Sequence, residues 1–318
     1  MTHLRRLGSE IRISIPADND GLTGRECPAP NCLGYFKIQL GTGLTGPGLP
    51  CHCPYCGHVG GHDTFWTQEQ IEYAKSVALN QITGALIKDL KALEFDHRPP
   101  SGSLFGIGMS LKVKGRPSPI HHYREKQLET EVICDNCALR YAVYGVFAFC
   151  PDCGAHNSLQ ILRKNVELVE KEITLAATVE PDLSAHLIGD ALENAVSAFD
   201  GFGREVCRVW ASRSCDPVKA EALSFQNIEG ARKSVQDFFG FNFAAGLTAD
   251  QWELGVRCFQ KRHLLAHKMG VVDRRYKKLA NDPYAVVGRK VSIASDDVAA
   301  LCEIVKSMGA RLLAELSK

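Results

Sequence analysis

The chain has 318 residues, a formal net charge of +1 and a composition ordinary for a soluble protein, and it is long for a single core. The near-zero net charge excludes a molecule that is basic throughout, so affinity for a polyanion has to come from a local cluster of cations. The first twenty residues hold no apolar stretch long enough for a signal peptide or a membrane span, which predicts a cytoplasmic protein without membrane contact.

The amino-terminal third carries the first of two cysteine groups. Eight of the thirteen cysteines fall into short paired spacings, which in a reducing compartment favour metal ligation over disulfides. In the first group the paired residues are Cys27 and Cys32, then Cys53 and Cys56. Gly57 allows the backbone to turn tightly after the last thiolate. Four nearby side chains are alternative ligands for one or two of these positions: Cys51, His52, His58 and His62.

The segments around this group predict little regular structure. Ile11 to Ile15 alternates apolar and polar residues, as a short strand does. The span between the two cysteine pairs is rich in turn formers and predicts a flexible loop. Its glycines and prolines are Gly41, Gly43, Gly46, Pro47, Gly48 and Pro50.

A helix and a connector follow. Thr67 to Gln70 has the pattern of a capping box, which predicts a helix from there to about Leu93. From His97 to Pro119 glycines and prolines interrupt any periodicity, which predicts a connector that holds one short strand.

The second cysteine group has the more regular spacing. Cys134 and Cys137 are separated by twelve residues from Cys150 and Cys153. Leu139 to Phe149 is largely apolar, which predicts a hairpin whose turns each present a thiolate pair. The group resembles a zinc ribbon with a closed, structural site. Iron is the alternative metal for four thiolates.

From Ile161 onward the pattern changes to helix. Glycine and proline become rarer, and apolar residues recur at helical spacing in five segments. Those segments are Ile161 to Val179, Pro181 to Ser212, Pro217 to Phe239, Thr248 to Met269, and Ser295 to Leu316. Together they predict a helical bundle.

One of these helices carries the run Arg262-His263-Leu264-Leu265-Ala266-His267. On a helical wheel, two histidines and three apolar residues share one face: Trp252, Val256, Phe259, His263 and His267. Three cations form a stripe that we expect to be solvated: Arg257, Lys261 and Lys268. The histidines are then either satisfied core residues, metal ligands four residues apart, or groups that act on a substrate.

The chemistry of the side chains favours action on RNA. Metal-independent cleavage of RNA needs a base for the 2′-hydroxyl, an acid for the leaving oxygen and positive charge on the phosphorane. Histidine and arginine supply these near neutral pH. His267 is the predicted acid or base, and Arg262 is predicted to hold the phosphate with two hydrogen bonds.

A basic segment surrounds this run. Between Arg257 and Lys290 there are ten Lys and Arg residues against two acids. Such a cluster is either a solvated surface or a track for a phosphate backbone. The predicted RNA contacts are Lys261, Lys268, Arg274, Arg275, Lys277 and Lys278.

The run from Arg262 to Tyr276 resembles the motif of HEPN-domain ribonucleases, in which an arginine, a polar residue and three further residues precede a histidine. The resemblance extends loosely over the helical half. It implies that His263 is the polar residue that orients its neighbours. It also implies a homodimer in which two motifs meet in one cleft, with the face of Trp252, Val256 and Phe259 supplying part of the contact. The expected product is a 2′,3′-cyclic phosphate.

The sequence therefore predicts a multidomain protein with two β-rich zinc-ribbon modules and a carboxy-terminal all-α HEPN-like bundle. The predicted parts are residues 1–66 with the first module, 67–120 with the helix and connector, 121–160 with the second ribbon, and 161–318 with the bundle. The expected function is an endoribonuclease with two structural Zn²⁺ ions and none required for catalysis.

A bacterial anti-phage or toxin-like setting, with a regulatory partner or phage-derived trigger, is the expectation from family analogy. The alternative function is a non-catalytic nucleic-acid-binding or assembly protein that uses the bundle for dimerisation.

Overall fold

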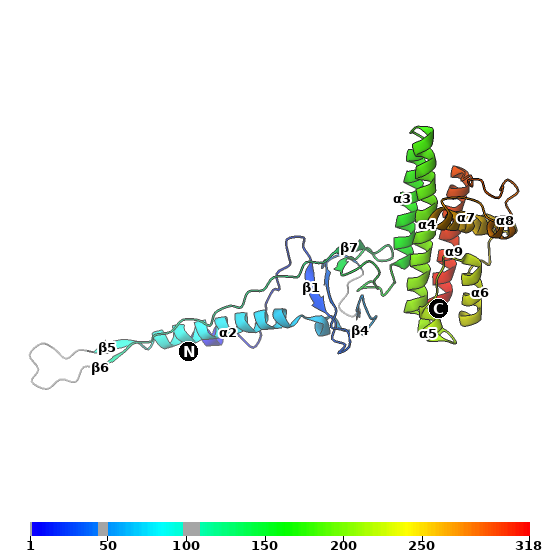
Figure 1. Ribbon diagram of the computed structural model, residues 1–318. Helices are drawn as coiled ribbons and strands as arrows, with labels where there is room; N and C mark the ends of the chain where they lie inside the picture. The colour runs from blue at the N-terminus through cyan, green and yellow to red at the C-terminus, as the bar shows by residue number, and fades with distance from the viewer. Residues whose placement is uncertain (1, 44–49, 98–108) are drawn as a thin grey trace, which may run out of the picture. The chain divides into compact units, whose positions relative to one another are not determined.

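The computed structural model describes residues 2–43, 50–97 and 109–318 (Figure 1). The chain divides into two compact units, which we call the N-terminal unit (Met1–Ala155) and the C-terminal unit (His156–Lys318). The N-terminal unit is rich in short strands and holds two four-cysteine clusters, and the C-terminal unit is a helical bundle. The predicted fold class is confirmed at this level.

One antiparallel sheet joins the two cysteine-rich segments of the N-terminal unit. Its strand order is β1-β2-β8-β7, from β1 (Thr23–Glu26), β2 (Tyr35–Ile38), β8 (Arg140–Val143) and β7 (Thr130–Ile133). β2 pairs with β1 on one edge and with β8 on the other, where Lys37 lies opposite Ala142. The two modules therefore share a sheet, which the sequence reasoning did not foresee.

Strand β2 corrects the prediction of a flexible loop between the first cysteine pairs. All four of its residues are buried, because the strand is central in the sheet and is covered on both faces. Gly46, Pro47 and Gly48, which contributed to the loop prediction, lie outside the described residues.

The predicted strand at Ile11 to Ile15 is also wrong. Its alternation is visible in the burial of its side chains, with Ile11, Ile13 and Ile15 partly buried and Arg12 and Ser14 exposed. Within the part of the chain that the structure describes, the segment nevertheless pairs with no strand, and pairing is what makes an extended segment part of a sheet.

The hairpin of the second module differs from the predicted one. β8 pairs with β7, which precedes Cys134, so the turn that contains Cys134 and Cys137 is itself the hairpin turn. Between Val143 and Cys150 the chain forms no strand. Non-local pairing of β8 with β2 helps to bury Tyr141 and Ala142, whereas Tyr144 and Val146 beyond β8 are exposed.

Smaller elements complete the N-terminal unit: α1 (Thr2–Arg6), β3 (Cys51–His52), β4 (Val59–Gly60), the 3-10 helix η1 (His62–Phe65), α2 (Gln68–Lys91), β5 (Phe95–His97) and β6 (Met109–Leu111). The capping box predicted for α2 is present, because the Thr67 side chain accepts from the Gln70 amide and the Gln70 side chain accepts from the Thr67 amide. Near the other end of α2, Asp89 accepts hydrogen bonds from the amides of Thr2, His3 and Leu4.

The predicted connector strand is confirmed as β6, which pairs with β5. Five of the residues that indicated the connector lie outside the described residues: Pro99, Pro100, Gly102, Gly106 and Gly108.

The C-terminal unit contains α3 (Ser158–Ala176), α4 (Pro181–Val209), the 3-10 helix η2 (Ala211–Arg213), α5 (Pro217–Glu221), α6 (Ile228–Phe239), α7 (Ala249–Lys268), α8 (Arg274–Leu279) and α9 (Ser295–Leu316). The helices α3, α4 and α9 pack side by side, and α7 lies across α4 and α9 (Figure 1). Four of the five predicted helical segments are confirmed within a few residues: α3, α4, α7 and α9.

The predicted helix from Pro217 to Phe239 is wrong as a single element. It is interrupted after α5 because Phe225 turns inward and packs against Phe199, with ring centroids 5.6 Å apart. Asp200 fixes this break by accepting a hydrogen bond from the Phe225 amide at 2.6 Å. Gly203 makes room for the ring, since a Cβ there would lie 2.5 Å from Phe225.

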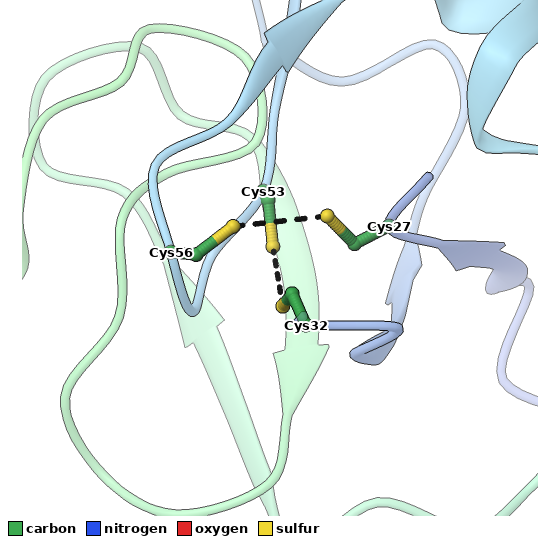
Figure 2. A group of neighbouring side chains, drawn as sticks. All are labelled: Cys27, Cys32, Cys53 and Cys56. Carbon is green, nitrogen blue, oxygen red and sulfur yellow. Dashed lines mark hydrogen bonds between the residues drawn. The ribbon is translucent and has the colours of Figure 1, made fainter. Parts of the chain in front are cut away.

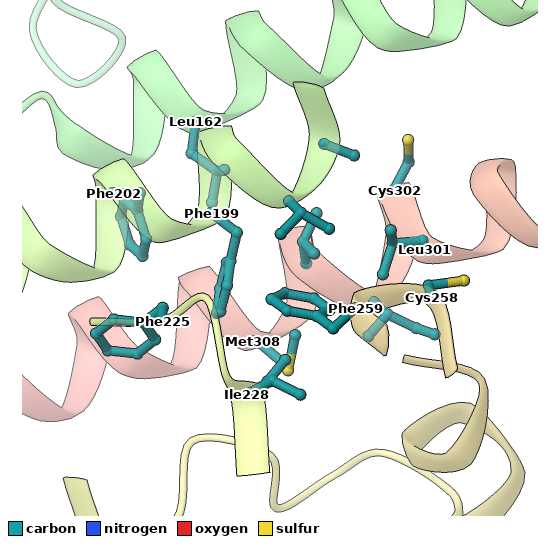
Figure 3. Close-up of a cluster of buried hydrophobic side chains, with 14 of the residues drawn as sticks. Leu162, Phe199, Phe202, Phe225, Ile228, Cys258, Phe259, Leu301, Cys302 and Met308 are labelled. Carbon is teal, nitrogen blue, oxygen red and sulfur yellow. The ribbon is translucent and has the colours of Figure 1, made fainter. Parts of the chain in front are cut away.

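The core of the C-terminal unit is an apolar cluster contributed by α3, α4, α6, α7 and α9 (Figure 3). Phe259 of α7 packs edge-on against Phe199 of α4, at a centroid distance of 6.3 Å. This contact anchors the middle of α7 in the bundle. The carboxy-terminal end of the helix, which carries Arg262 and His267, is therefore held in place by the packed part of the same helix.

Candidate metal centres and candidate active site

The first cysteine cluster consists of Cys27, Cys32, Cys53 and Cys56 (Figure 2). Cys27 directly follows β1, and Cys53 and Cys56 lie in the turn between β3 and β4. The sulfurs of Cys27 and Cys56 are 3.7 Å apart, as are those of Cys32 and Cys53. Gly57 has a φ of +70°, so the tight turn expected after the second pair is present.

The second cluster consists of Cys134, Cys137, Cys150 and Cys153. Its sulfurs approach to 3.6 Å between Cys134 and Cys153 and to 3.5 Å between Cys137 and Cys150. Gly154 has a φ of +70°, the same value as Gly57. Both clusters are therefore closed by the same local backbone conformation after a Cys-Pro-x-Cys sequence.

Both clusters fit a tetrahedral metal. Thiolates at a Zn–S distance of about 2.3 Å in a tetrahedron lie about 3.8 Å from one another, close to the distances in both clusters. Burial raises the pKa of Cys27 to about 11 and that of Cys137 to about 12, so these thiols ionise only when a cation offsets the loss of solvation. The clusters are metal-binding sites in small, zinc-ribbon-like modules.

The alternative ligands of the first site do not join the cluster. Cys51 is buried beside it, and desolvation raises the pKa of its thiol to about 12. The His52 ring lies against Gly154, and the His58 ring packs near Phe65 at a centroid distance of 6.1 Å. His62 begins the 3-10 helix η1.

The predicted catalytic residues lie in the last two turns of α7. The face that the helical wheel indicated passes from the core to solvent, because Val256 and Phe259 are buried, His263 is half-buried and His267 is exposed. Val256 and Phe259 pack inside their own unit, so the expectation that they contact a partner is wrong.

The rings of His263 and His267 are neighbours on one face of α7, with centroids 4.8 Å apart and planes tilted by 54°. Desolvation lowers the pKa of His263, and the neighbouring His267, Arg275 and Arg262 act in the same direction. His263 is therefore neutral near pH 7, where an imidazole can both donate and accept a hydrogen bond.

Arg262 is half-buried, and its Nε is enclosed without a hydrogen-bond partner among the described residues. It lies about 140° around the helix from His267. Within one chain the structure brings the two imidazoles together, while Arg262 is on another side of α7.

Lys261 is not exposed to solvent, so the prediction that it belongs to a solvated stripe of cations is wrong. It is only 5% exposed, and its Nζ lies 3.1 Å from Asp297 of α9. The partner that encloses it comes from a helix far along the sequence, so no local pattern marks this lysine as buried. An ammonium in this position is not available to an RNA phosphate.

The other predicted RNA contacts have exposed side chains, which are Lys268, Arg274, Arg275, Lys277 and Lys278. Four of them belong to the short helix α8, which starts because the Asp273 side chain accepts a hydrogen bond from the Tyr276 amide at 2.7 Å. Lys277 is tied locally, since its Nζ donates to the carbonyls of Asp282 and Ala285.

Sequence reasoning missed a pocket of about 420 Å³ next to the middle of α7. The residues of its wall that carry charge or an aromatic ring are Arg257, Lys261, Asp282, Tyr284, Lys290 and Asp297. Tyr284 was overlooked because it follows a proline in an irregular segment, where no periodicity shows whether a ring is buried or exposed.

Comparisons with family models, with curated proteins and with solved structures found no match to this chain. The resemblance to HEPN ribonucleases therefore depends on the motif in α7 alone. Among the described residues, no helix combines the length and the apolar character needed to cross a bilayer.

Proposed function

We propose that the protein is a metal-independent endoribonuclease whose catalytic residues are Arg262, His263 and His267. The observation that carries this proposal is the pair of neighbouring imidazoles at the solvent-exposed end of α7, on the same helix as an arginine whose Nε has no hydrogen-bond partner among the described residues. The exposed cations of α8 follow directly after it and supply positive potential for a polyanion.

The residues divide the work of a transesterification. One imidazole removes the proton from the 2′-hydroxyl, and the oxygen attacks the adjacent phosphorus as the bond to the 5′-oxygen breaks. The imidazolium formed in this way gives its proton to the leaving 5′-oxygen, so the products end in a 2′,3′-cyclic phosphate and a 5′-hydroxyl and the imidazole is regenerated. His267 acts as acid or base, His263 orients it, and Arg262 binds the phosphoryl oxygens.

The proposed active form is a homodimer. Arg262 and His267 point to different sides of one helix, so a phosphate between them is reached more readily when the two residues come from different protomers. Exposed apolar side chains beside the motif supply a surface for such contact, since Met269 is 85% exposed and Val271 is also exposed.

Both cysteine clusters are proposed to hold structural Zn²⁺. Four thiolates leave no open coordination position, so the ions stabilise the N-terminal unit and take no part in cleavage. This unit is then a candidate for recognising RNA or a regulatory partner, such as a trigger in anti-phage defence or a toxin-like system. The rival function is nucleic-acid binding or assembly without cleavage.

The direct test is cleavage of a labelled single-stranded RNA by zinc-loaded protein in buffer without other divalent ions. We expect His267→Ala and Arg262→Ala to reduce the rate by at least about 100-fold, because each removes a group that acts in the transition state. His186→Ala is the matched control, since this histidine is exposed on α4 and remote from the motif in sequence. Equal cleavage by wild type and His267→Ala, or no cleavage by any protein, favours the rival function.

Mixing two inactive variants tests the composite site. When Arg262→Ala and His267→Ala protomers exchange at random, half of the dimers are mixed, and each mixed dimer keeps one intact site. Activity should then recover to about a quarter of the wild-type value. No recovery after verified exchange contradicts a site shared between protomers.

A further inference from the structure

The charged side chains of the pocket beside α7 differ in whether they already have a hydrogen-bond or ion-pair partner. It lies between α7, which contributes Arg257 and Lys261, and the segment 282–294 together with Asp297 of α9. Both of its carboxylates already have partners. Asp297 is paired with Lys261, and Asp282 accepts hydrogen bonds from the Tyr276 hydroxyl at 2.7 Å and the Tyr284 amide at 3.0 Å.

The two remaining cations of the pocket are less firmly held, although Arg257 attracts the Asp282 carboxylate electrostatically. Among the described residues, neither Arg257 nor the Lys290 ammonium has a side-chain hydrogen bond or ion pair. The pocket therefore presents unused donors and few unused acceptors, so it suits a ligand that is anionic and rich in oxygen, as a phosphate is.

Tyr284 adds a flat apolar surface at the rim. The residue is 92% exposed, although its backbone amide donates a hydrogen bond to Asp282. The main chain of Tyr284 is held in place and its ring is exposed to solvent. An unpaired base can therefore stack on this ring. A base in a duplex is already stacked and cannot use it.

The pocket and the catalytic motif belong to one continuous piece of structure. The segment that carries Lys290 returns to the end of α7, since the Val272 amide donates to the Arg289 carbonyl at 2.9 Å and the Val291 amide donates to the Gly270 carbonyl at 2.8 Å. The wall of the pocket at Lys290 is therefore held by backbone hydrogen bonds against the turn that ends α7, directly after the catalytic motif.

We propose that this pocket binds one nucleotide of single-stranded RNA, with its base on Tyr284 and its phosphate between Arg257 and Lys290. The inference rests on the proposed function for the identity of the polymer, and it narrows the substrate to RNA that is unpaired at this position. The pocket is a binding subsite apart from the residues that break the bond.

The test measures binding of a fluorescein-labelled single-stranded RNA to the His267→Ala protein, in which cleavage does not interfere. Tyr284→Ala should weaken binding roughly five- to one-hundred-fold, because it removes one stacked base. Tyr284→Phe should retain the affinity, since the ring is kept. Lys290→Ala should also weaken binding and should reduce its dependence on salt. Tyr144→Ala is the control for an exposed tyrosine elsewhere in the chain.

Two further ligands identify what the pocket takes. Duplex RNA of the same sequence should bind equally well to Tyr284→Ala and to its parent. An unchanged affinity of single-stranded RNA for Tyr284→Ala overturns the subsite, as does an equal loss with the duplex. A free mononucleotide that competes as well as the oligonucleotide overturns the assignment to an RNA strand.

The same variants separate the subsite from the proposed catalysis. RNA binding that depends on Tyr284, in a wild-type protein that never cuts RNA, supports the subsite and refutes the endoribonuclease. Cleavage that depends on His267 but has an unchanged KM in Tyr284→Ala and in Lys290→Ala supports the endoribonuclease and refutes the subsite.

Discussion

Lys261 and Asp297 form an ion pair in which the lysine is almost fully enclosed and the aspartate keeps contact with solvent. We expect Asp297→Ala to lower the free energy of unfolding of the C-terminal unit by about 3 kcal/mol, because it leaves a buried ammonium without a counter-charge. Adding Lys261→Met should restore most of the loss. Denaturant unfolding measures both changes.

The control for this pair is Asp296→Ala. Asp296 is an exposed acid in the same first turn of α9, so it shares the favourable interaction with the helix N-terminus but not the contact with Lys261. A loss as large for Asp296→Ala as for Asp297→Ala would show that the helix end, and not the ion pair, accounts for the effect.

His156 makes the stability of the C-terminal unit depend on pH. Its side chain is 2% exposed, and burial lowers its pKa from 6.5 to about 4. As the pH falls, His156 therefore takes up a proton at a higher pH in the unfolded chain than in the folded chain. The contribution of His156 to stability should fall as pH decreases from about 6.5 to about 4, by about 3 kcal/mol in total, and this contribution should not change further below that range.

The measurement compares thermal unfolding of wild type and His156→Phe between pH 7.5 and pH 4. A phenylalanine can keep the edge-on contact that His156 makes with Trp210 at 5.6 Å, and it does not titrate. The variant should lose less stability than the wild type over this range. Parallel curves for the two proteins would contradict a buried, neutral histidine.

At the scale of elements, the two cysteine clusters should bind their metals independently of the other buried thiols. Cys32→Ser and Cys137→Ser should each reduce bound zinc from two ions per chain to one, because a three-thiolate site is open and weaker. Native mass spectrometry counts the ions. Cys51→Ser is the matched control, since Cys51 is buried next to the first cluster without belonging to it.

How well an element could be predicted depended on how local its cause is. The start of α2 is encoded within four residues, by Thr67 with Gln70, and was evident from the sequence; α7 starts with the same local pattern, formed by Thr248 with Gln251. The cysteine ligands were also predictable, because metal-binding turns have short, regular spacing. The pairing of β2 with β8 is set by contacts between distant segments, which leave no mark on either sequence.

In the candidate active site, too, features with a local cause could be predicted from the sequence, and features that depend on distant contacts could not. The rings of His263 and His267 meet because residues four apart share a helix face, as the wheel indicated. The burial of Lys261 depends on Asp297, and the break before α6 depends on Phe225 entering the core. Both arise from packing between helices, so the sequence pattern alone could not show them.

At the scale of the whole molecule, the two units should differ in their response to chelation. The apolar cluster of the N-terminal unit includes most of the metal-binding cysteines, whereas the core of the C-terminal unit consists of apolar side chains from the helices and the segments between them and includes none of the cluster cysteines. We expect a strong chelator to abolish cooperative unfolding of the N-terminal unit and to leave the melting temperature of the C-terminal unit unchanged.

Tryptophan fluorescence separates the two responses. Trp66 reports on the N-terminal unit, and Trp210 and Trp252 report on the C-terminal unit, so variants that keep only one group give one signal each. A shift of both transitions by the same amount would show that the units unfold together.

The shared sheet also constrains the order of events during synthesis. β2 leaves the ribosome early with only β1 beside it, and its other neighbour, β8, is made after the whole of α2 and the connector. Until then the backbone groups along one edge of β2 have no strand to pair with, and a nascent chain in this state can pair wrongly with another. A pause in translation before β8 should therefore favour aggregation, whereas one after β8 should not.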